Sequence, residues 1–382
     1  MSDCTLNLVR NVRQIKDGRR KQGKRYSSET IIWILILGLL CGEENLAAIY
    51  DLFLYKKSLV RFLVRITGKE LKTIPHVTTI SRALAKMNWQ NTLLQLLTID
   101  YGWILDELLI AVDGKTLRGI HNGTARHILS LVNQDCLPLT QCAVSTKENE
   151  IIAFKRLLSK VVLPPGTIIT ADALLTQAEI IEMMEKKKLD YVFKVKDNQK
   201  ELKSQLTYIF RQGLSDQTYP LKIDEFSKEE SNHDRETIWK VVTTTDFNST
   251  DLPVGFSSVK TLGFIYTITK RPQYELGTGI KTYVETNNLI FLISSTNKSA
   301  QELFSISRGH WRIENNLHWL KDTLYREDQQ TLSGSPAHLF TFLKSLTLGL
   351  IRQITHQISK FTRRFLLDST YQIYVLNRLG IC

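Results

Sequence analysis

Cysteine, proline and glycine are scarce in this sequence, and each scarcity argues against a class of protein. The five cysteines, at positions 4, 41, 136, 142 and 382, are scattered and form no C-x-x-C pair, which disfavours a disulfide framework or zinc knuckle and favours a reducing compartment. Only 8 Pro and 19 Gly occur among 382 residues, so the chain is neither collagen-like nor of low complexity. With 43% hydrophobic and 23% charged residues, it has the composition of a folded protein.

The sequence also lacks an apolar run long enough to cross a membrane. Its longest run, residues 31–42, has twelve residues and is closed by Glu43 and Glu44, whereas a membrane helix needs about 20. About thirty mostly polar residues precede this run and no small-residue cleavage site follows it, which disfavours a signal peptide. We therefore expect a cytoplasmic protein with no membrane partner.

Positive charge is in excess, with 50 Lys and Arg against 38 Asp and Glu and a net charge of +12. Both ends are basic, because residues 1–30 hold eight cations against three anions and residues 350–382 hold five against one. Lys and Arg that neutralise phosphates release condensed counterions, so this distribution favours a polyanionic partner such as nucleic acid. The alternative is a solvated charged tail at each end.

Residues 27–100 show only helical patterns. Helices are predicted over 28–40, 44–63 and 78–87, and the first is apolar nearly all round and hence buried. The third opens with Thr-Thr-Ile-Ser-Arg, and hydroxyls and amides at a helix start suit DNA phosphate oxygens. The same hydroxyls would serve equally well as an ordinary cap. We assign residues 1–103 to a helical N-terminal domain that is a candidate for DNA binding.

From residue 106, predicted strands alternate with predicted helices. Short apolar runs indicate buried strands, and longer amphipathic segments indicate helices. The strands cover 108–112, 126–133, 137–145, 167–171 and 191–196, and the helices cover 149–161, 177–188 and 198–211. The order β-β-β-α-β-α-β-α indicates an α/β fold with a mixed, RNase H-like sheet.

The remaining sequence adds two further regions. Residues 216–297 contain alternating segments at 238–245, 261–269, 281–286 and 289–294 and no clear helix, which predicts an all-β insertion. Helix returns from 297 to 326, and a long apolar helix or helix pair is expected from 337 to about 379. The predicted organisation is a catalytic domain (104–215 and 298–335) that contains the insertion and is followed by a C-terminal helical region (336–382).

Two of the predicted buried strands are followed directly by a carboxylate. Asp113 follows Ala111-Val112, and Asp172 follows Thr170-Ala171. Ligands of open α/β sheets gather at the carboxyl ends of strands, so two acids there predict a metal site. A single aspartate after a strand is more often a turn or a helix cap, but two matching positions in one sheet favour the metal.

A third carboxylate follows from helical geometry. At about 100° per residue, Glu314 shares a narrow ionisable stripe with His310, His318 and Lys321. An apolar stripe beside it consists of Ile306, Ile313, Leu317, Leu320 and Leu324. A helix that packs on a sheet and directs a carboxylate over the sheet edge has this pattern, although i,i+4 pairs on a surface helix produce it too.

Three carboxylates that converge from two strands and a helix can hold two divalent cations about 4 Å apart. Mg²⁺ prefers oxygen ligands and keeps open positions for phosphate and water. One ion would activate a water or a 3′-hydroxyl, and the other would stabilise the leaving oxygen. Such a site cuts or joins phosphodiester bonds, and the basic chain would hold the nucleic acid.

Five blocks of sequence carry a family pattern: DGKTLRG (113–119), KENEI (147–151), TADAL (170–174), DYVF (190–193) and RGHWRIEN (308–315), the last followed by LHW (317–319) and ED (327–328). In this order they resemble the H-repeat-associated (ISAs-type) insertion-sequence transposases, over about residues 10–350. The resemblance implies a DDE transposase with an RNase H-like catalytic domain, in which Asp113, Asp172 and Glu314 form the catalytic and metal-binding triad.

The same resemblance implies cofactors, partners and a location. It implies Mg²⁺, with Mn²⁺ as a substitute and two ions at the site. It implies hydrolysis of double-stranded DNA at terminal inverted repeats, strand transfer into target DNA, a homodimer in the synaptic complex, and a prokaryotic cytosol near the nucleoid. Basic side chains in or beside the blocks are candidates for contact with DNA: Lys115, Arg118, Lys196, Arg308, His310, Arg312, His318 and Lys321.

The sequence departs from the wider group at a few positions. The group carries a Tyr-Arg-Glu-Lys signature on the glutamate helix, and the corresponding residues here are Ser307, His310, Glu314 and Lys321. Leu175 stands where some relatives have histidine, and a His-Gly-Arg segment appears as His233-Asp234-Arg235. Trp311 and Trp319 are expected either to stack on a flipped base or, as is more common, to pack in the core. No departure touches a carboxylate.

Two other functions fit the same residues. A decayed or domesticated transposase would bind DNA without cutting it, and the intact triad argues against this. An RNase H-like nuclease of RNA or hybrids would use the same carboxylates, and only the family resemblance separates it from a transposase.

Overall fold

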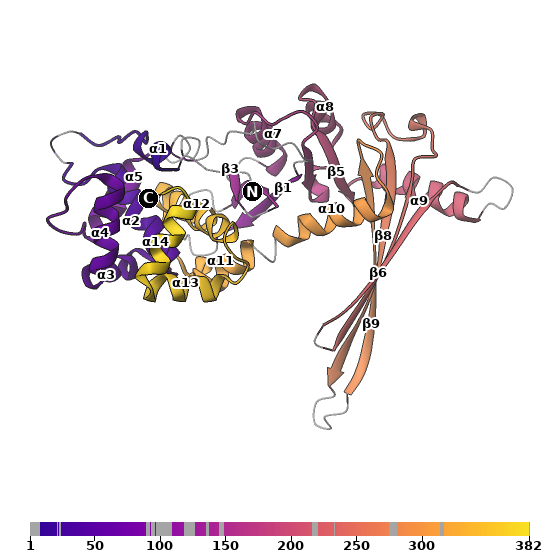
Figure 1. The fold of residues 1–382 in the computed structure, drawn as a ribbon. Coiled ribbons are helices and arrows are strands. Elements are labelled where there is room, and N and C mark those ends of the chain that lie inside the picture. Colours follow the sequence, from indigo (N-terminus) through magenta and orange to yellow (C-terminus); the bar gives the residue numbers. More distant parts are fainter. Residues whose placement is uncertain are drawn as a thin grey trace. The chain divides into compact units, whose positions relative to one another are not determined.

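The computed structural model describes residues 8–381 except 21, 23, 89–91, 93–95, 97–108, 118–126, 135–136, 145–148, 216–220, 233, 275–280 and 314–316. This part of the chain contains 13 α-helices and nine β-strands (Figure 1), and none of its helices is long and apolar enough to span a bilayer. The chain divides into two compact units. The first comprises Met1–Asp106, Val112–Val162 and Arg312–Cys382, and the second comprises Glu107–Ala111 and Leu163–Trp311.

The first unit begins with the helices α1 (Leu8–Arg13), α2 (Ser28–Leu40), α3 (Leu46–Tyr55), α4 (Lys57–Thr67) and α5 (Val77–Lys86). The predicted first helix is confirmed as α2. Its N-cap is Ser27, whose side chain accepts a hydrogen bond from the Thr30 amide. Every residue of α2 is buried, as its apolar sequence predicts, and it packs against α12 (Gly334–Arg352).

Two details of the helical region differ from the prediction. The single helix expected over 44–63 is divided into α3 and α4, because Lys56 leaves the helical conformation (φ −98°, ψ 81°). The cap of α5 is His76, whose Nδ1 accepts from the Thr78 amide at 3.3 Å. Thr78 is therefore inside the helix, and its hydroxyl is not the N-cap.

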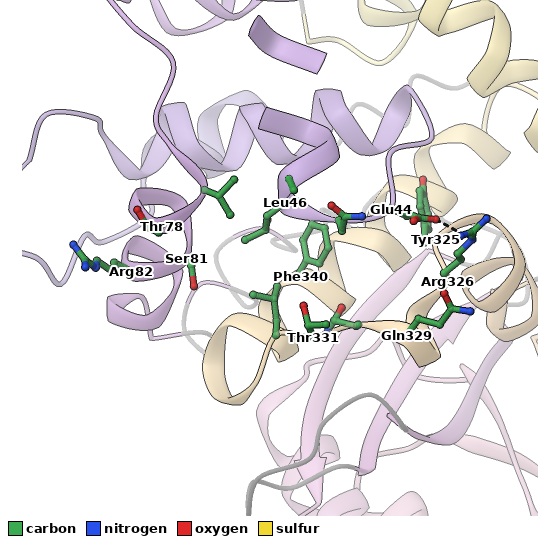
Figure 2. Close-up of a pocket in the computed structure, with 15 residues that line it drawn as sticks. Glu44, Leu46, Thr78, Ser81, Arg82, Tyr325, Arg326, Gln329, Thr331 and Phe340 are labelled. Carbon is green, nitrogen blue, oxygen red and sulfur yellow. Dashed lines mark ion pairs between the residues drawn. The ribbon is translucent and has the colours of Figure 1, made fainter. Parts of the chain in front are cut away.

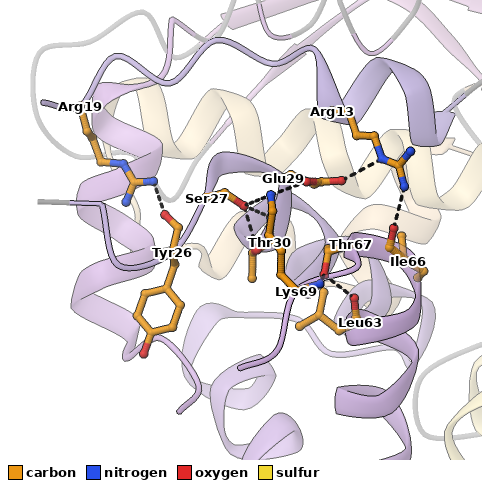
Figure 3. A network of polar contacts seen from close by, with 10 residues as sticks. All are labelled: Arg13, Arg19, Tyr26, Ser27, Glu29, Thr30, Leu63, Ile66, Thr67 and Lys69. Atoms are coloured by element: carbon orange, nitrogen blue, oxygen red, sulfur yellow. Dashed lines mark hydrogen bonds and ion pairs between the residues drawn. The ribbon is translucent and has the colours of Figure 1, made fainter. Parts of the chain in front are cut away.

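Several basic side chains near the N-terminus are bound within the helical part of the first unit (Figure 3). Arg13 Nε lies 3.2 Å from an oxygen of the buried Glu29, and Lys69 Nζ lies 2.8 Å from its other oxygen. Arg19 forms an ion pair with Asp17 at 2.7 Å. Part of the basic charge of residues 1–30 therefore takes part in ion pairs within the fold.

The rest of the first unit combines a β-hairpin with further helices. Strand β2 (His127–Asn133) pairs antiparallel with β3 (Pro138–Val144), and the strand order is β3-β2-β1, where β1 is Leu109–Thr116. Helix α7 (Glu150–Lys160) packs on β2 and β3. The predicted C-terminal helix or helix pair is instead three helices, α12, α13 (Ile358–Leu367) and α14 (Ser369–Arg378).

The second unit holds the start of β1 and six further strands, in the order β1-β4-β5-β9-β8-β7-β6. Their bounds are β4 Ile168–Ala171, β5 Asp190–Val195, β6 Asp224–Asn232, β7 Arg235–Thr244, β8 Thr261–Tyr274 and β9 Lys281–Ser294. Strands β4 and β5 are parallel, whereas β5–β9, β9–β8, β8–β7 and β7–β6 are antiparallel. The predicted mixed α/β class is confirmed.

The strands between 216 and 297 are longer than predicted (Figure 1). The segments expected at 281–286 and 289–294 form one strand, β9, because the backbone pairing with β8 continues through Asn287 and Asn288. Strand β6 was missed, since its sequence DEFSKEESN has few apolar residues to reveal it. Apart from the short 3₁₀ helix η4 (Ser249–Asp251), the described residues of this segment contain no helix.

Three α-helices complete the second unit: α8 (Ala178–Lys186), α9 (Lys200–Ser215) and α10 (Ala300–Ile313). Helix α10 buries Leu303, Phe304 and Ile306 in a core with residues of six strands: Leu109, Ile168, Val192, Trp239, Val241, Ile265 and Leu292. Of the predicted apolar stripe, Ile306 is confirmed as part of this core, and the packing fixes α10 on the sheet.

The contact of α12 with β3 gives a test of the fold. A Cβ at Gly349 would lie 2.8 Å from Leu137 Cα, closer than side chains approach backbone. Gly349→Ala improves helix propensity by about 1 kcal/mol, but overpacking costs about 1–3 kcal/mol. We expect thermal or urea unfolding to show a net loss of about 1 kcal/mol in the free energy of unfolding. A more stable variant would contradict this packing.

Candidate functional site

Asp113 lies on β1, directly after the last buried residue of that strand. The sequence predicts that the strand ends at Val112, but β1 continues to Thr116, and only its buried part ends at Val112. The Asp113 carboxylate is 21% exposed. Its Oδ1 accepts from the Gly114 amide at 2.8 Å, and its Oδ2 lies 2.7 Å from His318 Nε2. The carboxylate is thus oriented by two contacts and still partly open.

Gly114 is required by the side chains that pack beside this strand. His127 Nε2 and Glu150 Oε1 lie 2.6 Å apart, and a Cβ at position 114 would come within 2.4 Å of the former and 2.8 Å of the latter. Sequence reasoning did not identify this pair, although Glu150 belongs to the KENEI block. The pair supports the strand next to Asp113.

Asp172 occupies the position that the sequence predicts. It follows the fully buried strand β4 and precedes the 3₁₀ helix η3 (Ala173–Leu175). Its side chain is 54% exposed, and Lys196 Nζ lies 3.0 Å from its Oδ1. Partial burial raises the pKa of Asp172, but hydrogen bonds from Lys196 and from the Ala173 amide outweigh burial and leave the pKa below its usual value. The carboxylate is therefore ionised at neutral pH.

Glu314 lies outside the described residues, as do Arg118 and the side chain of Arg312. The described residues on either side of it do not form the one regular α-helix to residue 326 that the sequence predicts. Helix α10 ends at Ile313, a π-helical turn follows at Leu317 and His318, and α11 covers Trp319–Leu324. A π turn shifts the helical register, and such turns are frequent at functional sites. The angular positions predicted for one regular helix therefore do not hold beyond Ile313.

His310 is an internal residue of the second unit. It is 6% exposed, and its Nδ1 lies 3.1 Å from Thr170 Oγ1 on β4. The Thr170 hydroxyl also lies 3.4 Å from the Ile110 carbonyl of β1. His310 therefore connects α10 to β4, and this buried position does not match the expected contact with DNA.

Lys115 and Lys321 are also bound internally. Lys321 is 2% exposed, and its Nζ lies 3.2 Å from Glu327 Oε2. Lys115 Nζ lies 2.9 Å from the same oxygen and also forms an ion pair with Asp322. The expectation that Lys321 contacts DNA is not matched by its position, because its ammonium is enclosed with a carboxylate.

Arg308 lies in a cavity of about 500 Å³ in the second unit. Its guanidinium stacks over the rings of Trp239 at 4.8 Å and Trp311 at 4.5 Å, and it lies 3.6 Å from Glu230. Apolar side chains and hydroxyl, amide and basic side chains also line it: Ile265, Ile290, Phe304, Lys194, Arg235, Thr237, Thr267, Thr269, Thr286, Asn287, Asn288 and Ser307. Trp311 and Trp319 are 42% and 60% exposed, so the core-packing alternative is wrong for both. Aromatic faces beside cations suit unpaired nucleic acid bases.

A second cavity, of about 510 Å³, lies in the first unit (Figure 2). Leu46 and Phe340 lie at its centre, and Glu44 and Arg326 form an ion pair of 3.2 Å at one side. Thr78, Ser81 and Arg82 of α5 line the other side. The hydroxyl-rich segment that the sequence singles out therefore borders a cavity.

The donor chemistry of the two described aspartates fits a magnesium site. Both offer partly exposed carboxylate oxygens, the ligand that Mg²⁺ prefers. Within the part of the chain that the structure describes, no three His, Cys, Asp or Glu side chains are grouped closely enough to hold a metal ion. That part does not include Glu314, the third expected ligand.

Comparison with known proteins gives two family matches and several relatives. Residues 105–350 match the family model described as "Transposase DDE domain", and residues 9–96 match the model described as "DDE_Tnp_1-associated". The chain is 26% identical to "Putative transposase YncI" of Escherichia coli O157:H7, over 87% of this chain and 84% of that protein.

Two relatives come from Escherichia coli strain K12. "Putative protein YbfL" is 25% identical over 98% of both chains. "H repeat-associated putative transposase YhhI" is 27% identical over 72% of this chain and 73% of its own length. The first family model spans more than half of the sequence and the second most of the region before it. The predicted resemblance is thus confirmed, and the chain belongs to the DDE transposase family.

Proposed function

We propose that this protein cleaves DNA at the ends of an insertion sequence and joins the ends to target DNA, with Asp113, Asp172 and Glu314 as its catalytic carboxylates. The observation that carries the proposal is the match of the transposase DDE model over residues 105–350, which include all three acids. We further propose that the catalytic domain is RNase H-like and that residues 1–103 bind DNA. Two Mg²⁺ or Mn²⁺ ions bound by the acids would supply the activation of the nucleophile and the stabilisation of the leaving oxygen.

A basic side chain orients each of the two aspartates, and Lys196 also lowers the pKa of Asp172. His318 contacts Asp113 from the turn before α11, and Lys196 contacts Asp172 from the end of β5. Loss of a side chain that orients a metal-binding carboxylate typically lowers metal affinity or activity by about 10- to 100-fold. Lys196 is 51% exposed, so it also remains available to a DNA phosphate near Asp172.

Histidines four residues before and four residues after Glu314 contact the strands that lead to the two aspartates. His310 precedes it by four residues and is bound to Thr170, two residues before Asp172. His318 follows it by four residues and is bound to Asp113 itself. Each histidine thus ties one flank of Glu314, within its own unit, to a strand that carries or precedes an aspartate.

Helix α4 offers the DNA a regular row of cations. Lys57, Arg61 and Arg65 are exposed at i, i+4 and i+8, about 6 Å apart along the helix axis. The opposite face buries Leu59, Phe62, Leu63 and Ile66. We propose that this row contacts the DNA backbone, because phosphate contacts hold a duplex in register irrespective of its sequence.

The catalytic proposal predicts the effect of removing each acid. Asp113→Asn, Asp172→Asn and Glu314→Gln should each lower Mg²⁺-dependent nicking of DNA that carries the terminal inverted repeats by at least about 10³-fold, or ~4 kcal/mol. The assay is strand cleavage on end-labelled duplex, and gel-shift affinity in EDTA should be unchanged. Cleavage in EDTA, or full activity in any of the three variants, would contradict the proposal.

The same experiment separates the alternatives. Equal, salt-dependent affinity for random and terminal-repeat DNA without nicking indicates a decayed transposase. Preferential cleavage of RNA or hybrids indicates an RNase H-like nuclease. Inverted repeats flanked by short direct repeats in the DNA around the gene would supply the substrate.

The contact of His318 with Asp113 predicts a smaller loss. His318→Ala should reduce metal affinity or cleavage rate by about 10- to 100-fold, the usual effect of losing a group that orients a ligand. The measurement is the cleavage rate as a function of Mg²⁺ concentration. Thr323→Ala, at an exposed position of α11, is the matched control and should leave the curve unchanged. Equal curves for all three proteins would remove His318 from the site.

The row on α4 predicts a change in salt dependence. Each phosphate contact contributes about 0.9 to the slope of log Kobs against log salt for duplex DNA. Arg61→Ala should reduce the slope by about 0.9, and the triple change of Lys57, Arg61 and Arg65 to Ala by about 2–3. Lys186→Ala, an exposed lysine of α8 that pairs with Glu182, is the control. An unchanged slope in the triple variant would place the DNA elsewhere.

A further inference from the structure

The first unit contains a buried cluster of ion pairs that includes Lys115, two residues after Asp113. It consists of Lys115 on β1, Lys321 and Asp322 on α11, Lys344 on α12 and Glu327; we call it the Glu327 cluster. The Glu327 side chain is fully buried, and one of its oxygens, Oε2, lies 2.9 Å from Lys115 Nζ and 3.2 Å from Lys321 Nζ. A single carboxylate oxygen thus joins a strand and a helix.

Two hydrogen bonds fix the segment that carries Glu327. The hydroxyl of Tyr325 donates to the Leu39 carbonyl of α2 at 2.9 Å, and Lys344 Nζ donates to the Tyr325 carbonyl at 3.0 Å. Arg326 has a left-handed backbone (φ 41°), a conformation that a residue with a Cβ rarely adopts. Such a conformation persists only where the surrounding structure enforces it. Glu327 therefore has a rigid base in η6 (Glu327–Gln329).

Stability alone does not explain the cluster. Burial raises the pKa of Glu327, but the charges of Lys321, Lys115 and Lys344 outweigh it and hold the pKa at about 2. The carboxylate is therefore ionised at neutral pH, whereas burial lowers the pKa of Lys321 and lowers that of Lys344 to about 8. Apolar residues of similar volume usually stabilise a protein as well as a buried ion pair does, or better. What a buried ion pair adds is a defined register between the elements that it joins.

The ion pairs of Glu327 fix the position of β1, near Asp113, relative to the α11 segment. Lys115 follows Asp113 by two residues, and alternate residues of a strand point to the same face. Lys321 follows His318 by three residues, and His318 lies against Asp113. Strand β1 and the α11 segment are thus joined twice, by His318 with Asp113 and by Lys115 and Lys321 with Glu327.

We propose that Glu327 is a positioning residue of the transposase site, which holds the Asp113 strand against the segment that follows Glu314. This proposal rests on the proposed function, in which Asp113 and Glu314 act together. Glu327 does not touch the reacting atoms. It acts through Lys115 and Lys321, whose ammonium groups it keeps in place.

The test compares four full-length variants with the wild type. Glu327→Gln keeps the shape of the side chain but leaves the lysines without their buried counter-charge, so it is expected to unfold at a lower temperature. The double variant Glu327→Gln/Lys344→Met restores the charge balance by removing one cation. Lys344→Met alone shows what loss of the Lys344 bonds to Tyr325 and Gln330 contributes, and it should keep a cleavage rate close to that of the wild type. Glu44→Gln is the matched control, since it removes the neighbouring ion pair with Arg326 and touches neither element.

The proposal predicts a separation of stability from activity. The double variant should regain a melting temperature close to that of the wild type. Its kcat for Mg²⁺-dependent cleavage should remain about 10- to 100-fold low, with KM for DNA unchanged. Glu44→Gln should cleave at the wild-type rate. If stability and kcat both recover in the double variant, Glu327 only balances charge and the proposal is overturned.

Hydrogen exchange provides a readout that does not depend on activity. Without DNA or metal, the double variant should exchange amides of 112–117 and 319–324 faster than the wild type, while α2 and α7 stay unchanged. If the wild type cleaves no DNA, the proposed function fails, but this exchange pattern still decides whether Glu327 joins β1 to α11. Unchanged exchange in both segments overturns that role.

Discussion

The structure depends on one electrostatic constraint: each acid at the candidate site must remain ionised in a protein that binds a polyanion. Among the described residues, Asp113, Asp172 and Glu327 each have a basic partner from another element. His318 lies against Asp113, Lys196 against Asp172, and Lys115 with Lys321 against Glu327. The lysines lower the pKa of Asp172 and of Glu327, and all of these contacts fix the segments that carry the acids.

The sequence predicted what local pattern determines. The all-apolar segment became the buried helix α2, and a four-residue apolar run became β4 with Asp172 directly after it. It did not reveal that Lys321 is buried, because the partner, Glu327, enters from a 3₁₀ turn whose position depends on α2 and α12. It also could not reveal the π-helical turn near Glu314, since a uniform 3.6-residue period was assumed.

Only part of the excess positive charge lies on the surface, where it can bind DNA. Some of it is enclosed in the fold, since Lys115, Lys321 and Lys344 bind carboxylates or carbonyls within the first unit. These groups stabilise and position the fold. The cations that remain exposed in a regular row, as on α4, are the better candidates for DNA, so the +12 net charge overstates the surface available for binding.

Membership of the DDE transposase family and the oriented aspartates lead to one central claim, that this chain uses metal-dependent carboxylate chemistry on DNA. The most direct measurement is the mapping of new 3′-hydroxyl ends on duplex that carries the terminal repeats, incubated with the wild-type protein in Mg²⁺ or in EDTA. The account predicts 3′-hydroxyl ends at the repeat boundary in Mg²⁺ and none in EDTA. Ends at random positions, or equal cleavage in both conditions, would contradict it.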